Sequence, residues 1–79
     1  MQAILNVCFA QIDVKPGFPY KNLEKALKAV LKAKSEKADI ILFPEMVLPG
    51  YLLGDLWERE SFINETLSAQ TKLIDAARD

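Results

Sequence analysis

The chain has 79 residues with a formal net charge of −1, of which 51 % are hydrophobic and 27 % charged. This length allows at most one small domain, which buries only about 60–65 % of its unfolded surface. The near-neutral charge gives no electrostatic reason to expect a nucleic acid or an anionic membrane as partner.

The residue types restrict the possible chemistry. Because the chain contains no histidine, Ser-His-Asp and Cys-His nucleophile pairs are excluded within it, and a metal site is not expected. Acid–base catalysis must rest on a carboxylate, a lysine, a tyrosine or the single cysteine. One cysteine cannot form an internal disulfide, and the first residues lack the basic region of a signal peptide, so we expect a cytoplasmic protein. No apolar run approaches the roughly 20 residues that span a bilayer.

The first half of the chain predicts a strand, a loop and a helix. Residues 2–12 are apolar except for Gln2, Asn6 and Gln11, which indicates a buried strand. The prolines and glycine of 13–20 indicate a loop. From about Asn22 the apolar period becomes helical. We expect the apolar side of this helix to consist of Leu23, Ala26, Leu27, Val30, Leu31 and Ala33.

The second half predicts another strand and another helix. The run "ADIILF" (38–43) is apolar except for Asp39 near its start, and such a run is typical of a parallel strand covered on both faces. Residues 45–62 indicate an extended loop with one short helix after Asp55, in which Trp57 and Phe62 are expected to be exposed. A helix then follows from about Ser61, with Ile63, Leu67, Ile74 and Ala77 on its apolar stripe.

This order predicts a right-handed βαβ unit followed by a second helix. Two parallel strands and two helices do not complete a sheet, because both faces and both edges need cover. We therefore interpret 1–79 as the incomplete N-terminal part of one larger α/β domain.

Glu45 is an acid at the end of the second strand. Pro44 cannot donate to a strand ladder and keeps Phe43 extended, so pairing ends there. Ligands of open α/β sheets bind beyond the carboxyl ends of the strands. Apolar neighbours would partly desolvate the carboxylate, which favours a general base. The alternative is a structural role, in which Glu45 caps a turn or pairs with a surface lysine.

The residues that follow suggest a family. The segment "KNLEKALKAVLKAKSEKADIILFPEMVLPGYLLGDL" resembles the nitrilase, or carbon–nitrogen hydrolase, superfamily, in which Ala-Asp precedes an apolar strand that ends in Phe-Pro-Glu. "AQIDV" (10–14) is similar to the family's first strand. The run from Gly50 to Leu56 looks most like the glutaminase domain of glutamine-dependent NAD synthetases.

The resemblance implies a four-layer αββα sandwich and a Glu-Lys-Cys triad, with Glu45 as the general base and Tyr51 near the substrate amide. The base takes the thiol proton, returns a proton to the departing ammonia and then activates water. It also implies glutamine as substrate, a homo-oligomer, and ATP and Mg²⁺ in a separate synthetase domain. No cofactor is implied for this chain.

The family's lysine and nucleophilic cysteine lie downstream of this glutamate, beyond Asp79. Cys8 lies inside the first predicted strand, which favours an inert core position. We therefore expect the isolated chain to be inactive. Two alternatives stay open: another carbon–nitrogen hydrolase (an ω-amidase, nitrilase or carbamoylase), or a small non-enzymatic α/β module.

Overall fold

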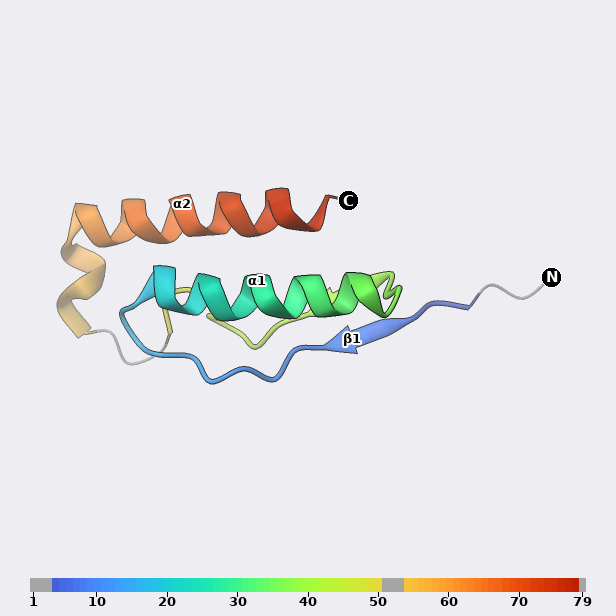
Figure 1. Cartoon of the computed structure of the whole chain (residues 1–79). Coiled ribbons are helices and arrows are strands. Elements are labelled where there is room, and N and C mark those ends of the chain that lie inside the picture. Colours follow the sequence, from blue (N-terminus) through green and yellow to red (C-terminus); the bar gives the residue numbers. More distant parts are fainter. Residues whose placement is uncertain (1–3, 51–53, 79) are drawn as a thin grey trace.

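The computed structural model describes residues 4–50 and 54–78. These residues form a β-α-β-α arrangement with one additional short helix, which confirms the predicted α/β class (Figure 1). The elements are β1 (Val7–Phe9), α1 (Pro19–Ser35), β2 (Ile40–Leu42), the 3₁₀ helix η1 (Gly54–Glu58) and α2 (Glu60–Ala77). No helix in this part of the chain is long and apolar enough to cross a bilayer.

The two strands are parallel and in a register that is fixed at both ends. Val7 is opposite Ile40 and Phe9 is opposite Leu42. Before the ladder, the carbonyl of Asn6 accepts from the N–H groups of Asp39 (2.8 Å) and Ile40 (3.2 Å). The Asn6 N–H donates in return to the Asp39 carboxylate at 2.9 Å. Both strands are shorter than the predicted ranges 2–12 and 38–43, because only three residues of each pair with the other.

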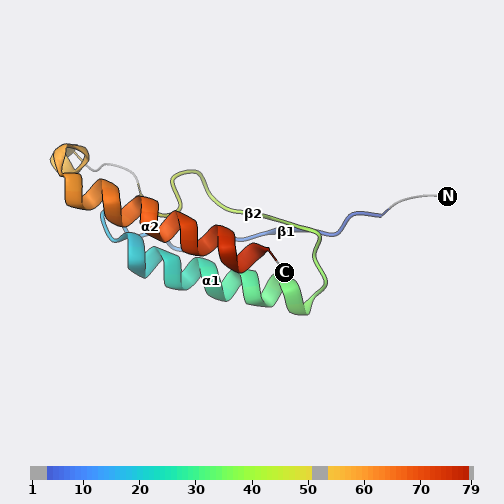
Figure 2. The ribbon, with the colours of Figure 1, turned by 90° about the horizontal axis from the view of Figure 1, so that it is seen from above.

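Both helices lie on the same side of the strands and run in the direction opposite to them (Figures 1 and 2). Side chains of a strand alternate between its two faces. Cys8 and Ile41, at the centres of the two strands, are half-buried and line one cavity together with α1 residues. The covered face of the sheet is therefore the one that carries Cys8 and Ile41.

The core lies between the two helices and the loop after β2. Leu23 of α1, Leu48 of the loop and Ala69 of α2 are buried together, with Leu27 and Leu73 packed against them. Helix α1 begins at Pro19, earlier than predicted, because proline is well suited to the first turn of a helix.

The predicted apolar side of α1 is largely correct, with two differences. Leu23, Ala26, Val30 and Ala33 are buried, whereas Leu31 is 67 % exposed. Asn22 takes a place on the buried face. Leu31 is exposed because α2 and the strands contact only one narrow stripe of α1, and Leu31 lies outside that stripe.

The predicted stripe of α2 is wrong. Ile63, Leu67, Ile74 and Ala77 are exposed, and the buried residues of this helix are Phe62 and Ala69. Helix α2 carries apolar residues on two sides, and the side that meets α1 is the one its sequence pattern did not favour. The prediction that Phe62 is exposed is therefore wrong too; the side chain of Trp57 lies outside the described part of the structure.

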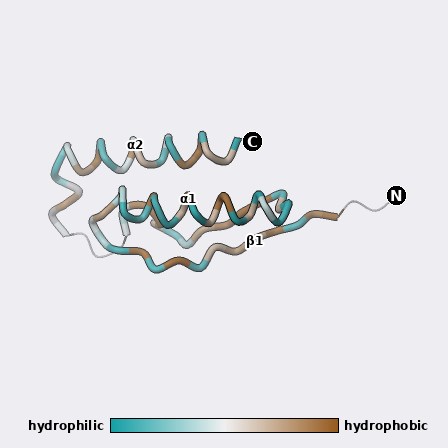
Figure 3. The backbone as a smooth tube through the Cα atoms, in the orientation of Figure 1, coloured by the Kyte–Doolittle hydropathy of each residue, from teal (hydrophilic) through white to brown (hydrophobic). Residues whose placement is uncertain are grey.

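The second face of the sheet has no cover among the described residues. Val7, Phe9, Ile40 and Leu42 point away from the helices and are between 42 % and 73 % exposed. Figure 3 shows this apolar character along β1 and the chain before it. The prediction of cover on both faces of the second strand is thus fulfilled on one face only.

Candidate active site

Glu45 lies three residues after β2, at the carboxyl end of the parallel strands, as predicted. Its side chain is exposed, so the partial desolvation expected from its apolar neighbours is not found in this chain. The carboxylate makes no hydrogen bond or ion pair with any residue of 4–50 or 54–78. A surface ion pair with a described lysine, one of the structural roles considered, is therefore excluded.

A tight turn over residues 45–49 carries this acid. Directly after Glu45, Met46 has a positive φ of 56°, a left-handed conformation that costs a non-glycine residue about 1 kcal/mol. The turn closes where the Gly50 N–H donates to the Met46 carbonyl at 2.8 Å. The backbone conformation that directs Glu45 outward is therefore specific and slightly strained.

The far end of this turn is buried. The side chain of Leu48 is 5 % exposed and packs against Leu23 and Ala69, so it anchors the turn between the two helices. The Leu48 carbonyl accepts a hydrogen bond of 2.7 Å from the Asn22 side chain. The exposed acid is therefore attached to a backbone segment that is held by the core.

Gly50 lies where the turn after β2 approaches the loop after β1. Its φ is +83°, and a Cβ at this position would lie 2.6 Å from the Cα of Pro16. Only glycine combines this backbone conformation with such an approach. Tyr51, the predicted substrate-binding residue, follows Gly50 in sequence and lies outside the described residues.

Asn22 is the residue of this region that the sequence analysis missed. It is fully buried and is the only buried polar residue in the described part of the chain. A signal for it existed: Asn22 precedes Ala26 and Val30 at intervals of four on the buried face of α1, so a polar group in that row must find partners inside the protein.

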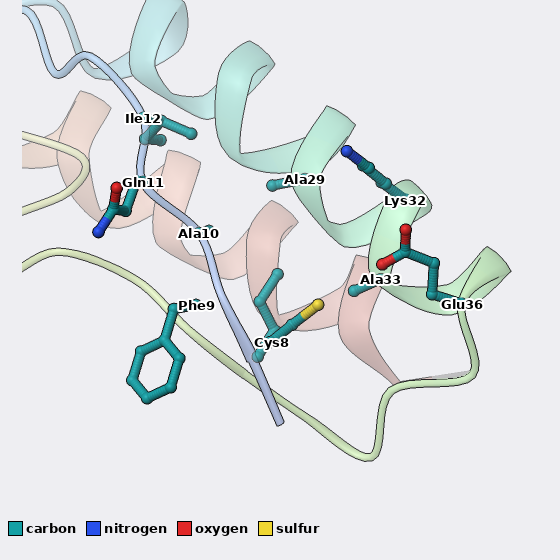
Figure 4. Close-up of a pocket in the computed structure, with 10 residues that line it drawn as sticks. Cys8, Phe9, Ala10, Gln11, Ile12, Ala29, Lys32, Ala33 and Glu36 are labelled. Carbon is teal, nitrogen blue, oxygen red and sulfur yellow. The ribbon is translucent and has the colours of Figure 1, made fainter. Parts of the chain in front are cut away.

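Cys8 lies apart from this turn. It is half-buried and lines a cavity of about 520 Å³ between β1 and α1, with Lys32 and Glu36 on the α1 side (Figure 4). Its partner in the register is Ile41, in the middle of the strand pair and not at the carboxyl end where Glu45 follows. The predicted core position of Cys8 is thus only half correct, and the structure does not place the thiol beside the acid.

Among the described residues, no group of three or more His, Cys, Asp or Glu side chains is arranged to hold a metal ion.

The sequence profile of the carbon-nitrogen hydrolase family matches residues 6–78. The chain belongs to the carbon–nitrogen hydrolase family. The match includes both strands, both helices and the turn that carries Glu45. It confirms the resemblance that was inferred from the Phe-Pro-Glu segment, and the two parallel strands with two helices are consistent with part of this family's fold.

Three curated relatives that the chain matches are all named glutamine-dependent NAD(+) synthetase. The chain is 36 % identical over 75 residues to a glutamine-dependent NAD(+) synthetase of Thermotoga maritima and 38 % identical over 76 residues to one of Aquifex aeolicus. It is 32 % identical over 75 residues to one of Xanthomonas campestris pv. campestris. These alignments include 94–96 % of this chain but only 13–14 % of each relative. No solved structure matches the chain significantly.

Proposed function

We propose that residues 1–79 are the N-terminal part of a thiol-dependent amidase domain that hydrolyses glutamine and supplies ammonia for NAD synthesis. The observation that carries the proposal is the position of Glu45: an exposed acid without a partner among the described residues, on a turn that Leu48 attaches to the core at the carboxyl end of two parallel strands. The names of the three relatives support glutamine as the amide.

In this proposal Glu45 is the general base, and Tyr51 lies near the substrate amide. The carboxylate accepts the proton of a cysteine thiol as the thiol attacks the amide carbonyl, and it returns a proton to the departing ammonia. In this proposal the cysteine and lysine partners of Glu45 belong to the chain beyond these 79 residues. The same further chain contains a synthetase domain that uses ATP and Mg²⁺, and it forms the contacts of a cytoplasmic homo-oligomer. The isolated chain lacks them and is proposed to be inactive.

The uncovered face of the sheet gives independent support to the idea that the domain is larger. Four large apolar residues of two adjacent strands are exposed there, on one side of the sheet. Exposed apolar area of this kind marks a surface that another part of a protein covers. In the proposed domain, further strands of the same chain take that place.

The test uses the full-length protein that contains these residues. Glu45→Gln is expected to lower the rate of ammonia release from glutamine by about 10²–10⁴-fold, because it removes a general base and preserves side-chain shape. NAD formation supported by added ammonium salts is expected to be unchanged. Glu24→Gln, at an exposed site on α1, is the matched control and should leave both rates as they are.

The possible results separate the alternatives. Normal glutamine hydrolysis by the Glu45→Gln variant would refute the proposed role of this acid. If the unsubstituted protein hydrolyses a nitrile, a carbamoyl compound or another amide but not glutamine, it would be another carbon–nitrogen hydrolase and the proposed glutamine substrate would be wrong. A gene that ends at the codon for Asp79, with a product that folds as a monomer, would favour the non-enzymatic module.

A further inference from the structure

Asn22 joins α1 to both of the loops that leave the carboxyl ends of the strands. Its Oδ1 accepts from the Lys15 N–H at 2.7 Å, and its Nδ2 donates to the Lys15 carbonyl at 2.8 Å. The second Nδ2 hydrogen is donated to the Leu48 carbonyl at 2.7 Å. Lys15 belongs to the loop after β1 and Leu48 to the turn after β2, so one side chain connects the two.

The Asn22 side chain favours one arrangement of the two loops because it is fully buried. A buried amide without partners is costly, so it favours the single arrangement in which all of its polar groups are bonded. No buried side-chain nitrogen or oxygen of the described residues lacks a hydrogen bond. If either loop moves away, Asn22 loses partners that water cannot replace inside the core.

Two further contacts hold the same pair of loops together. The Gly17 N–H donates to the Pro49 carbonyl at 2.8 Å. The backbone of Gly50 approaches Pro16 so closely that no side chain fits between them. The loop after β1 and the turn after β2 therefore form one packed unit, and Asn22 lies at its buried side.

Glu45 depends on this unit for its position. No described side chain contacts its carboxylate through a hydrogen bond or ion pair, so the backbone of 45–50 determines where the acid lies. Catalytic groups must be held within about 0.5 Å of their productive position. A displacement of about 1 Å costs on the order of 10²-fold in rate.

We infer that Asn22 is a positioning residue: through its hydrogen bond to the Leu48 carbonyl it holds the turn that presents Glu45 to the substrate. The inference rests on the proposed role of Glu45. It adds that the loop after β1 helps to hold this turn, because Asn22 is hydrogen-bonded to the backbone of both. Asn22 itself does not touch the reacting atoms.

The test combines two independent perturbations with matched controls in the full-length protein. Asn22→Ala removes the three hydrogen bonds, and Gly50→Ala forces the two loops apart while the Asn22 side chain itself is kept. Val30→Ala, a buried change elsewhere on α1, controls for general loss of stability. Gly54→Ala controls for the glycine change, since its φ is +56° but nothing lies within 4 Å of an added Cβ.

We expect Asn22→Ala and Gly50→Ala to lower kcat for glutamine hydrolysis by about 10–100-fold, after correction for the folded fraction, with KM changed less than about threefold. Val30→Ala and Gly54→Ala should retain kcat. Hydrogen exchange of 43–50 should become at least about tenfold faster in Asn22→Ala than in Val30→Ala, because the Gly50 amide is bonded within this turn.

The results decide the inference separately from the proposed function. If Glu45→Gln is inactive but Asn22→Ala and Gly50→Ala keep kcat, the inference is wrong and the proposed function stands. A larger effect on KM than on kcat would also overturn it. If the unsubstituted protein does not hydrolyse glutamine, the proposed function falls, and the exchange rate of 43–50 then decides whether Asn22 holds the turn.

Discussion

The Leu48 side chain should anchor the turn that carries Glu45, in addition to the Asn22 hydrogen bond, and Leu48→Ala tests this. Leu48 is 5 % exposed and packs between α1 and α2. Removing three buried carbon groups costs about 2.4 kcal/mol in transfer free energy alone. The cavity adds to this cost, but a loop can move to fill it more easily than a helix can. We therefore expect the free energy of unfolding to fall by about 3 kcal/mol, within the usual range for buried leucines.

Leu31→Ala is the matched control, because it is the same substitution on a side chain that is 67 % exposed. Alanine is the best helix former, so the change in unfolding free energy should stay within about 0.5 kcal/mol. The sequence pattern alone places Leu31 on the apolar side of α1, so the pair of variants also separates the structure from that pattern.

The assay is urea unfolding of the 79-residue chain, followed by circular dichroism of the helices at one protein concentration for all variants, because the isolated chain is expected to self-associate. With an m-value of about 1 kcal/mol per molar urea, Leu48→Ala should lower the midpoint by about 3 M or abolish the folded signal. Leu48→Val is the milder variant and should lower the free energy of unfolding by about 1 kcal/mol. Equal midpoints for Leu48→Ala and Leu31→Ala would refute the proposed anchoring of the turn.

Three further predictions concern the helix end, the cysteine and the sheet face. Lys37 has a φ of +59° in a Schellman turn after α1, so Lys37→Gly should stabilise the chain by about 0.5–1 kcal/mol. The melting temperature should therefore rise by about 2–8 °C, and an unchanged or lower melting temperature would contradict this prediction. In the full-length protein, Cys8→Ser should leave ammonia release from glutamine unchanged, and a loss comparable to that of Glu45→Gln would show that Cys8 is the nucleophile after all. The isolated chain should self-associate in sedimentation experiments through its exposed sheet face, and changing both Phe9 and Leu42 to lysine should make it monomeric. Identical sedimentation of the unsubstituted chain and the double variant would exclude this face as the contact.

The strands and the place of the acid could be predicted because their signals are local. The apolar runs located both strands, although the paired segments Val7–Phe9 and Ile40–Leu42 are shorter than the runs, and Pro44 directly precedes Glu45. The alternation that decides which strand residues are covered is also local. Whether the second face has a cover depends on what else the chain packs against, and no local pattern contains that information.

The helix faces show where such reasoning stops. Helix α2 has apolar residues on two sides, and the packing of Ala69 against Leu23 and Leu48 selects the side with Phe62. Asn22 was overlooked because an asparagine near a helix start suggests a cap or a solvated position. Its actual role depends on Lys15 and Leu48, which lie 7 and 26 residues away in sequence.

The electrostatics of Glu45 connect the uncovered sheet face with the missing partners. In this chain the carboxylate is exposed and has no hydrogen-bond or ion-pair partner among the described residues. If another layer covers the face formed by Val7, Phe9, Ile40 and Leu42, the carboxyl end of the strands lies at the edge of that new interface. A carboxylate moved into such a place is strongly disfavoured unless a cation or several donors accompany it. If such a layer also buries Glu45, we expect it to bring a compensating cation or donors to the carboxylate, and the lysine that the family resemblance implies is a group of that kind.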